Sequence, residues 1–125
     1  VELVRADRAR PEARRTGRYV EIYRDRGVLL TVEDGAVQRA VHTSTGAGGA
    51  TPSGSYRVYR KETYSWSVPF SVWMPWASYF LGGYAMHEYP DVPGYPASHG
   101  CVRLPAGEAQ RVFRFAEYGT PVFVF

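Results

Sequence analysis

The sequence predicts a mostly β domain with one helix near the C-terminus, and three observations support this fold class. The 125 residues include 9 Pro, 13 Gly and 10 Tyr, a composition typical of turns and aromatic-rich strands. Short apolar segments alternate with turn residues along most of the chain. One stretch near the C-terminus has the period of an amphipathic helix. Because strands joined by short turns must bury a shared face, we favour a closed or sandwiched sheet.

The first half of the chain predicts a meander of short strands separated by turns that contain Gly. Strands are expected at residues 19–23, 28–32 and 36–43, with turns at residues 24–27 and 33–35. Residues 44–55 hold four Gly among Ser, Thr and Pro, and we expect a loop there.

A further strand opens at Tyr56, Val58 and Tyr59. Residues 62–86 are dense in Tyr, Trp, Phe, Pro and Gly and have no sustained helical period. We therefore expect short strands and ordered loops in that segment.

One helix is predicted to begin near Pro105, because Pro is tolerated in the first turn of a helix. Its apolar face is formed, at spacings of three, four and seven residues, by Ala109, Val112, Phe113 and Ala116. Gly119 is a stop signal for this helix. Residues 121–125 alternate Val and Phe and predict a buried closing strand.

Length and charge suggest one globular domain preceded by a basic arm, residues 1–17. An apolar content of 45% is enough for a core, and the longest apolar runs, such as residues 28–30, are too short to span a bilayer. Eight of the 15 basic residues lie between Arg5 and Arg26. Such an arm can attract polyanions, but no aromatic side chain precedes Tyr19 to stack on bases. We favour a solvated linker and expect no nucleic-acid partner.

Cys101 is the single cysteine, which excludes an intrachain disulfide and leaves either a buried hydrophobe or a reactive thiol. A thiol needs a nearby base to become a nucleophile at neutral pH. The chain offers His42, His87 and His99. His99 shares a face with the cysteine only if the segment is a strand, and a loop could fold His87 back across the thiol. Gly100 permits close approach of a substrate, and the N–H groups of Gly100 and Cys101 could form an oxyanion hole.

Residues 98–104, Ser-His-Gly-Cys-Val-Arg-Leu, resemble the signature of the L,D-transpeptidase catalytic domain family, in which a His and a spacer precede Ser/Thr-His-Gly-Cys. Other segments that resemble the family are residues 44–46, 51–54, 79–80, 83–87 and 119–122. The resemblance covers residues 18–125. It implies a β-sandwich-like domain with a capping region over the active site.

The resemblance also implies roles for individual residues. Cys101 would be the nucleophile and His87 its general base, oriented by the backbone carbonyl of Glu88. His99 and Gly100 would shape the oxyanion pocket. We further expect contacts with substrate from Ser98, Arg103, Tyr84 and Tyr79.

The implied reaction is attack of the thiolate on a peptidoglycan tetrapeptide stem, after its diamino acid. The terminal D-Ala leaves, and an amine of a second stem resolves the acyl-enzyme into a 3→3 cross-link. No cofactor or metal is implied. The expected partners are stem peptides and, as covalent inhibitors, carbapenem β-lactams, and the substrate places the domain in the bacterial cell envelope.

Other functions remain open alongside this one. If water resolved the acyl-enzyme, the protein would be an L,D-carboxypeptidase. If the lysine of an envelope protein resolved it, the same nucleophile would attach that protein to the stem. A non-catalytic wall-binding module is a rival from another class, and a zinc site at His87, His99 and Cys101 lacks a nearby fourth ligand.

Two departures from the family pattern are visible. Only ten residues separate His87 from Ser98, so we expect a compact loop between them. Residues 104–105, Leu-Pro, stand where many relatives continue toward an Asn.

Several other side chains admit two interpretations. Arg103 could bind a substrate carboxylate or pair with an acid to fix the cysteine loop. We expect His42 to be structural or at the surface and neither Glu88 nor Asp91 to perform acid–base work. Core packing, with one or two residues at the cleft, is the favoured explanation for Tyr64, Trp66, Trp73, Trp76 and Tyr79.

Overall fold

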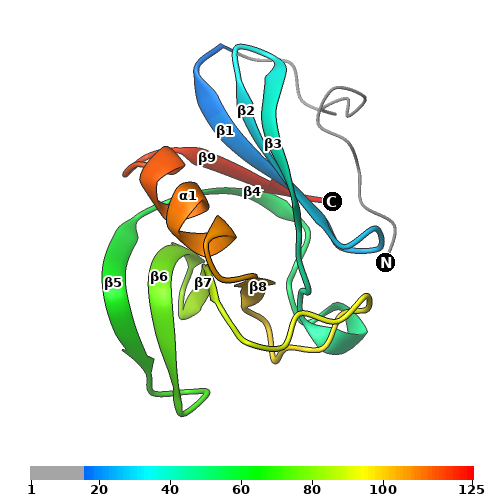
Figure 1. The fold of residues 1–125 in the computed structure, drawn as a ribbon, viewed down its shortest axis with the longest axis vertical. Coiled ribbons are helices and arrows are strands. Elements are labelled where there is room, and N and C mark those ends of the chain that lie inside the picture. The colour runs from blue at the N-terminus through cyan, green and yellow to red at the C-terminus, as the bar shows by residue number, and fades with distance from the viewer. Residues whose placement is uncertain (1–15) are drawn as a thin grey trace.

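The computed structural model describes residues 16–125, so nearly all of the predicted basic arm lies outside the described residues. The elements (Figure 1) are, in chain order, β1 (Arg18–Tyr23), β2 (Val28–Glu33), β3 (Ala36–His42), the 3₁₀ turn η1 (Ala47–Gly49), β4 (Gly54–Arg57), β5 (Arg60–Ser67), β6 (Val72–Leu81), β7 (Tyr84–Glu88), β8 (Val102–Leu104), α1 (Glu108–Phe115) and β9 (Pro121–Val124).

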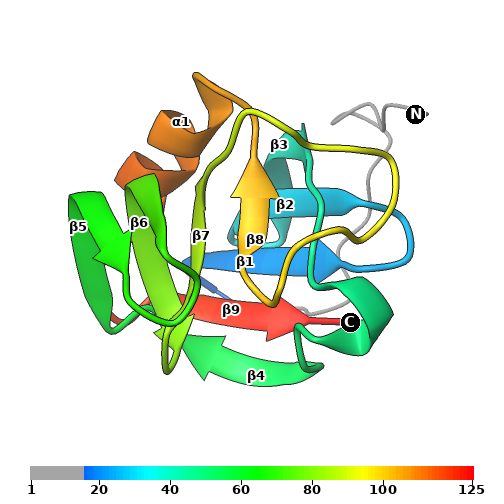
Figure 2. The same ribbon diagram turned by 90° about the horizontal axis from the view of Figure 1, so that it is seen from below.

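The strands form two sheets that pack as a sandwich, as Figures 1 and 2 show from two sides. The first sheet has the order β3-β2-β1-β9-β4 and the second has the order β5-β6-β7-β8. β9 pairs parallel with β1, and β8 pairs parallel with β7, whereas the other pairs are antiparallel. The predicted fold class, mostly β with one helix near the C-terminus, is confirmed.

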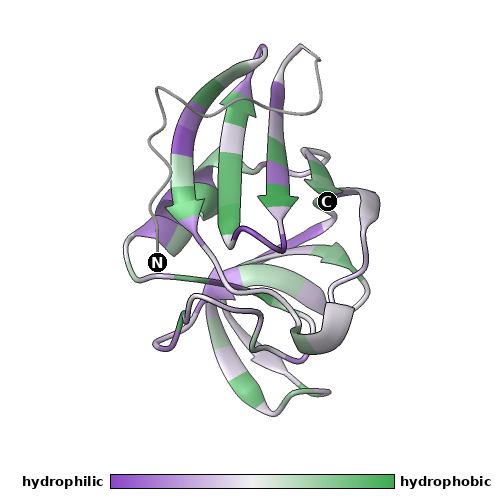
Figure 3. Cartoon of the chain, turned by 90° about the vertical axis from the view of Figure 1, so that its right-hand side faces the viewer, coloured by the Kyte–Doolittle hydropathy of each residue, from purple (hydrophilic) through white to green (hydrophobic). Residues whose placement is uncertain are grey.

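The main core lies between the two sheets and the helix. It contains Val20, Ile22, Leu29, Val41, Val58, Phe80, Met86, Val102, Leu104, Ala109, Val112, Ala116, Val122 and Val124. Figure 3 shows the bands of hydrophobic and hydrophilic residues along the strands that supply it. Burying each large aliphatic side chain contributes about 1.5–3 kcal/mol. In the described part of the chain the one helix, α1, has eight residues, too few to cross a bilayer.

Most predicted elements lie close to their expected places. The meander of residues 18–43 is β1 to β3, and the closing strand is β9. The helix begins at Glu108 rather than near Pro105, because Gly107 has a left-handed φ of 84°. Residues 60–81 form one long hairpin, β5 and β6, where short strands were expected.

The pairing of β7 with β8 brings the two halves of the signature together. His87 lies opposite Arg103 in this parallel register, and Cys101 directly precedes β8. Parallel neighbours need a crossover connection, which residues 89–101 supply without a helix. The ten-residue spacer is therefore part of the connection that places His87 beside the cysteine loop.

Candidate active site

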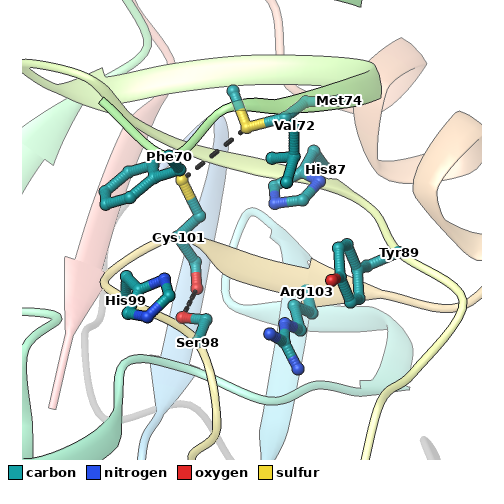
Figure 4. Close-up of a pocket in the computed structure, with 9 residues that line it drawn as sticks. All are labelled: Phe70, Val72, Met74, His87, Tyr89, Ser98, His99, Cys101 and Arg103. Atoms are coloured by element: carbon teal, nitrogen blue, oxygen red, sulfur yellow. Dashed lines mark hydrogen bonds between the residues drawn. The ribbon is translucent and has the colours of Figure 1, made fainter. Parts of the chain in front are cut away.

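A partly open pocket of about 90 Å³ lies where the β5–β6 hairpin, β7 and the cysteine loop meet (Figure 4). Its lining contains five residues that the sequence predicted: Cys101, His87, His99, Ser98 and Arg103. Four further residues line it that the sequence did not single out: Phe70, Val72, Met74 and Tyr89. Val72 and Met74 are two residues apart, so on a strand they share one face. This spacing is hard to recognise in the sequence because the segment is so rich in aromatic residues.

His87 is buried and held in one orientation by its own backbone. Its Nδ1 lies 2.7 Å from the carbonyl oxygen of Glu88, so Nδ1–H donates and Nε2 carries the free lone pair. Burial lowers the pKa of His87 to about 4, with a smaller lowering from Arg103 and an opposing effect of the Glu88 carbonyl. The imidazole is neutral at pH 7 and can accept a proton.

Cys101 is also buried, with 4% of its surface exposed. Burial raises the pKa of its thiol to about 11, against smaller lowering effects of the Ala85 backbone and Arg103. The group is therefore a neutral thiol at pH 7. Buried between hydrocarbon side chains, it packs in a cluster with Met74, Ala77, Tyr79 and Ala85.

The thiol is turned toward the β5–β6 hairpin, as Figure 4 shows. Its Sγ lies 3.8 Å from Met74 Sδ and 3.8 Å from the carbonyl oxygen of Gly83. Among residues 16–125 no hydrogen bond joins it to His87.

The cysteine loop is fixed by hydroxyl groups from two segments. Ser98 Oγ donates to the carbonyl of Cys101 and accepts the N–H of Gly100 at 3.1 Å. Thr51 Oγ1 donates to the carbonyl of Gly100 at 2.6 Å and accepts the N–H of Gly46 at 2.7 Å. Because the Gly100 N–H is engaged, the N–H of Cys101 is the remaining candidate of the two predicted oxyanion donors.

Backbone conformation and steric contact also require glycine at position 100. Its φ is +150°, and a Cβ there would lie 2.6 Å from the ring of Tyr84. Tyr84, predicted to contact substrate, instead packs beneath the cysteine loop and against Phe70, with ring centroids 6.0 Å apart. Its position supports the loop from behind the pocket.

Tyr79 was also predicted to contact substrate, but in this structure its side chain is packed away from the pocket. The side chain is 3% exposed, and its hydroxyl lies 2.6 Å from Ser65 Oγ. The Arg60 guanidinium covers the ring at 4.7 Å. A residue buried in this way is part of the packing behind Cys101.

Arg103 lines the pocket and faces the aromatic ring of Tyr89, 4.1 Å from its centroid. One N–H donates to the backbone carbonyl of Asp91 at 3.3 Å. No acidic side chain within residues 16–125 pairs with it, so the predicted alternative of an acid partner is not found. Its remaining donors are available to a substrate carboxylate.

His99 is exposed and stacks on Phe70, with ring centroids 6.0 Å apart at 13°. It forms the outer wall of the pocket, opposite His87. His42 is structural, as expected, because its Nε2 lies 2.8 Å from the Val92 carbonyl and ties down the spacer loop. Within residues 16–125 no three His, Cys, Asp or Glu side chains are grouped closely enough to hold a metal ion.

The expectation of core packing for most of five aromatic residues is wrong. Tyr64, Trp66 and Trp73 are 60%, 46% and 51% exposed. Trp76 packs on Phe113 of α1, with centroids 5.3 Å apart. The exposed three lie toward the turn of the β5–β6 hairpin, where Trp66 pairs with Trp73 and Tyr64 with Pro75.

The buried imidazole predicts an acid-dependent loss of stability. The folded-state pKa of His87, about 4, lies below the unfolded value of 6.5, so its contribution is complete above pH 6.5 and is lost as pH falls toward 4. The loss should reach about 3 kcal/mol. Chemical denaturation at several pH values should show a His87→Gln variant losing less stability than wild type over this interval by about that amount. Equal losses would contradict a buried neutral imidazole.

Comparison with known proteins agrees with the sequence signature. The family model described as the L,D-transpeptidase catalytic domain matches residues 17–124. The chain belongs to this family. No curated protein sequence matches it.

Solved L,D-transpeptidases share the fold. One from Xylanimonas cellulosilytica is 34% identical, with a TM-score of 0.88, over 94% of this chain and 64% of that one. One from Stackebrandtia nassauensis is 30% identical, with a TM-score of 0.82, over 95% of this chain and 59% of that one. L,D-transpeptidase 3 from Mycobacterium tuberculosis, in complex with a faropenem-derived adduct, is 20% identical, with a TM-score of 0.75, over 86% of this chain and 60% of that one. The chain spans about three fifths of the length of these relatives.

Proposed function

We propose that this domain is a peptidoglycan L,D-transpeptidase of the bacterial cell envelope that forms 3→3 cross-links through an acyl-enzyme on Cys101. The observation that carries the proposal is the geometry of His87. Its Nδ1 is fixed by the Glu88 carbonyl, which leaves Nε2 as an acceptor in the same small pocket as the single thiol. At pH 7 both groups are neutral, so the imidazole is free to accept the thiol proton as attack on the carbonyl proceeds.

Acylation begins when the Cys101 side chain turns from Met74 toward His87. Nε2 takes the thiol proton as Sγ forms a bond to the carbonyl carbon that follows the diamino acid of the donor stem. The Cys101 N–H donates to the oxyanion that develops. The C–N bond to D-Ala then breaks, the leaving amine takes the proton from His87, and a thioester remains.

Deacylation reverses the roles of the same groups. The amine of an acceptor stem attacks the thioester carbonyl and loses a proton to His87 as the new amide bond forms. The C–S bond breaks, its electron pair stays on Sγ, and His87 returns the proton to give the free thiol. Arg103 is suited to hold a stem carboxylate at the mouth of the pocket, because its free N–H groups form a fork that matches two oxygens.

Two solved relatives support a β-lactam as a second acylating agent. One, a transpeptidase called LdtMt1, is in complex with imipenem, and the M. tuberculosis enzyme holds a faropenem-derived adduct. For this chain we expect the strained β-lactam carbonyl to take the place of the stem amide at Cys101.

Incubation with purified disaccharide-tetrapeptide should test the cross-linking activity. The expected product, identified by mass spectrometry, is a dimer with release of one D-Ala for each link. Tripeptide without dimer would show that water resolves the acyl-enzyme and would replace transpeptidation by L,D-carboxypeptidation. Product only in the presence of a lysine-containing protein acceptor would indicate protein attachment, and no product at all would favour the wall-binding module.

A further inference from the structure

The β5–β6 hairpin carries three exposed aromatic rings, here called the aromatic platform, formed by Tyr64, Trp66 and Trp73. Trp66 lies directly opposite Trp73 in the antiparallel register. Tyr64 stacks on Trp73 with centroids 4.6 Å apart at 5°, and Trp66 meets the same ring edge-on at 5.2 Å. The rings hold one another in place before any ligand arrives, so binding costs little side-chain entropy.

The aromatic platform and the pocket are opposite faces of the same two strands. Successive side chains of a strand point to opposite faces, so Val72 and Met74 face the pocket while Trp73 between them faces away. Met74 Sδ contacts Cys101 Sγ at 3.8 Å. Only the two strands of the hairpin therefore separate a ligand on the platform from Cys101.

The charge pattern limits what the aromatic platform can bind. Residues 63–86 contain no Asp, Glu, Lys or Arg, although 22% of the chain is charged. The charged residues at the start of β5 are already engaged, since Arg60 pairs with Glu62 and Lys61 donates to the Phe113 carbonyl, so the hairpin offers little to a polyanion or a charged peptide. A hairpin that inserts into a membrane would present aromatic residues at its tip. Here Phe70, in the turn, stacks on His99 and Tyr84, and the exposed apolar residue of the turn is Val68.

We propose that the aromatic platform binds the uncharged sugar rings of a peptidoglycan glycan strand. This proposal rests on the proposed function, since the stem peptides that would reach Cys101 hang from such strands. A pyranose ring offers an apolar C–H face that stacks on an aromatic ring, while its hydroxyl groups stay in water.

Binding of a soluble N-acetylglucosamine oligomer, followed by quenching of tryptophan fluorescence and by calorimetry, tests this proposal in the absence of a stem peptide. Trp73→Ala should weaken binding at least about tenfold, because it removes the central ring of the platform. Trp73→Phe should keep binding within about threefold and shows whether the loss is due to the ring rather than to misfolding. Tyr118→Ala is the matched control, since that ring is 66% exposed outside the hairpin.

The outcomes are distinct from those of the cross-linking assay. Wild-type protein that does not bind the oligomer, or Trp73→Ala that binds as well as wild type, would overturn the glycan site even if stem peptides are cross-linked. Tryptophan-dependent binding to neutral phospholipid vesicles without binding to the oligomer would overturn it in favour of a membrane contact. Oligomer binding that depends on Trp73 supports the site, and because it does not use Cys101 it stands if the cross-linking assay fails.

Discussion

Cys101→Ala protein should form no covalent adduct with a carbapenem, whereas wild type should gain the mass of one inhibitor molecule. The thiol is the only cysteine sulfur in the 125 residues, so a stoichiometric thioester can arise at one position alone. Removal of the nucleophile should lower the acylation rate by more than about 10³-fold. Intact-mass spectrometry, followed by peptide mapping, measures the adduct and its position.

The substitution is mild enough for the loss to be interpreted. Cys101 lies in a small cluster with Met74, Ala77, Tyr79 and Ala85, and replacing the sulfur by hydrogen leaves a cavity that costs only about 1 kcal/mol. A melting curve close to that of wild type is the control. An adduct that persists on Cys101→Ala would show that another side chain is the nucleophile. Wild type without an adduct would count against the activated thiol itself.

The parts of the fold that the sequence predicted are those controlled by local chemistry. Gly-containing turns at residues 24–27 and 33–35 set the meander of β1 to β3, and the spacing of apolar residues set α1. The signature around Cys101 identified the family, because four consecutive residue types with a distant His form a specific pattern. The structure then places that His opposite Arg103, in a parallel pairing that no local pattern encodes.

The pocket wall and the exposed aromatic residues depend on tertiary register. Short strands were expected in residues 62–86 because that segment is dense in Tyr, Trp, Phe, Pro and Gly. In the structure β6 instead continues through Pro75 and through Trp76, whose φ is a left-handed 55°. Val72 and Met74 face the pocket, whereas Trp73 faces solvent. Without the register of the hairpin, the sequence could not distinguish these two faces. The burial that makes both the thiol and the imidazole neutral likewise comes from packing across the two sheets and the hairpin.

His87→Gln should slow carbapenem acylation by about 10²–10⁴-fold and change its dependence on pH. In wild type the imidazole, with a pKa of about 4, remains a base throughout the neutral range. The rate should be flat near pH 7 and fall as His87 is protonated toward pH 4. Single-turnover acylation, followed by mass or by loss of β-lactam absorbance, measures both profiles.

Without the imidazole, attack must draw on thiolate that forms unaided. A thiol with a pKa of about 11 is ionised to about one part in ten thousand at pH 7. The His87→Gln rate should therefore rise about tenfold for each pH unit toward 11, a slope that wild type lacks. His42→Gln is the matched control, because that imidazole also meets a backbone carbonyl but lies outside the pocket, and it should keep the acid limb of wild type. If His87→Gln keeps the flat profile of wild type, the proton leaves Cys101 by a route other than Nε2 of His87.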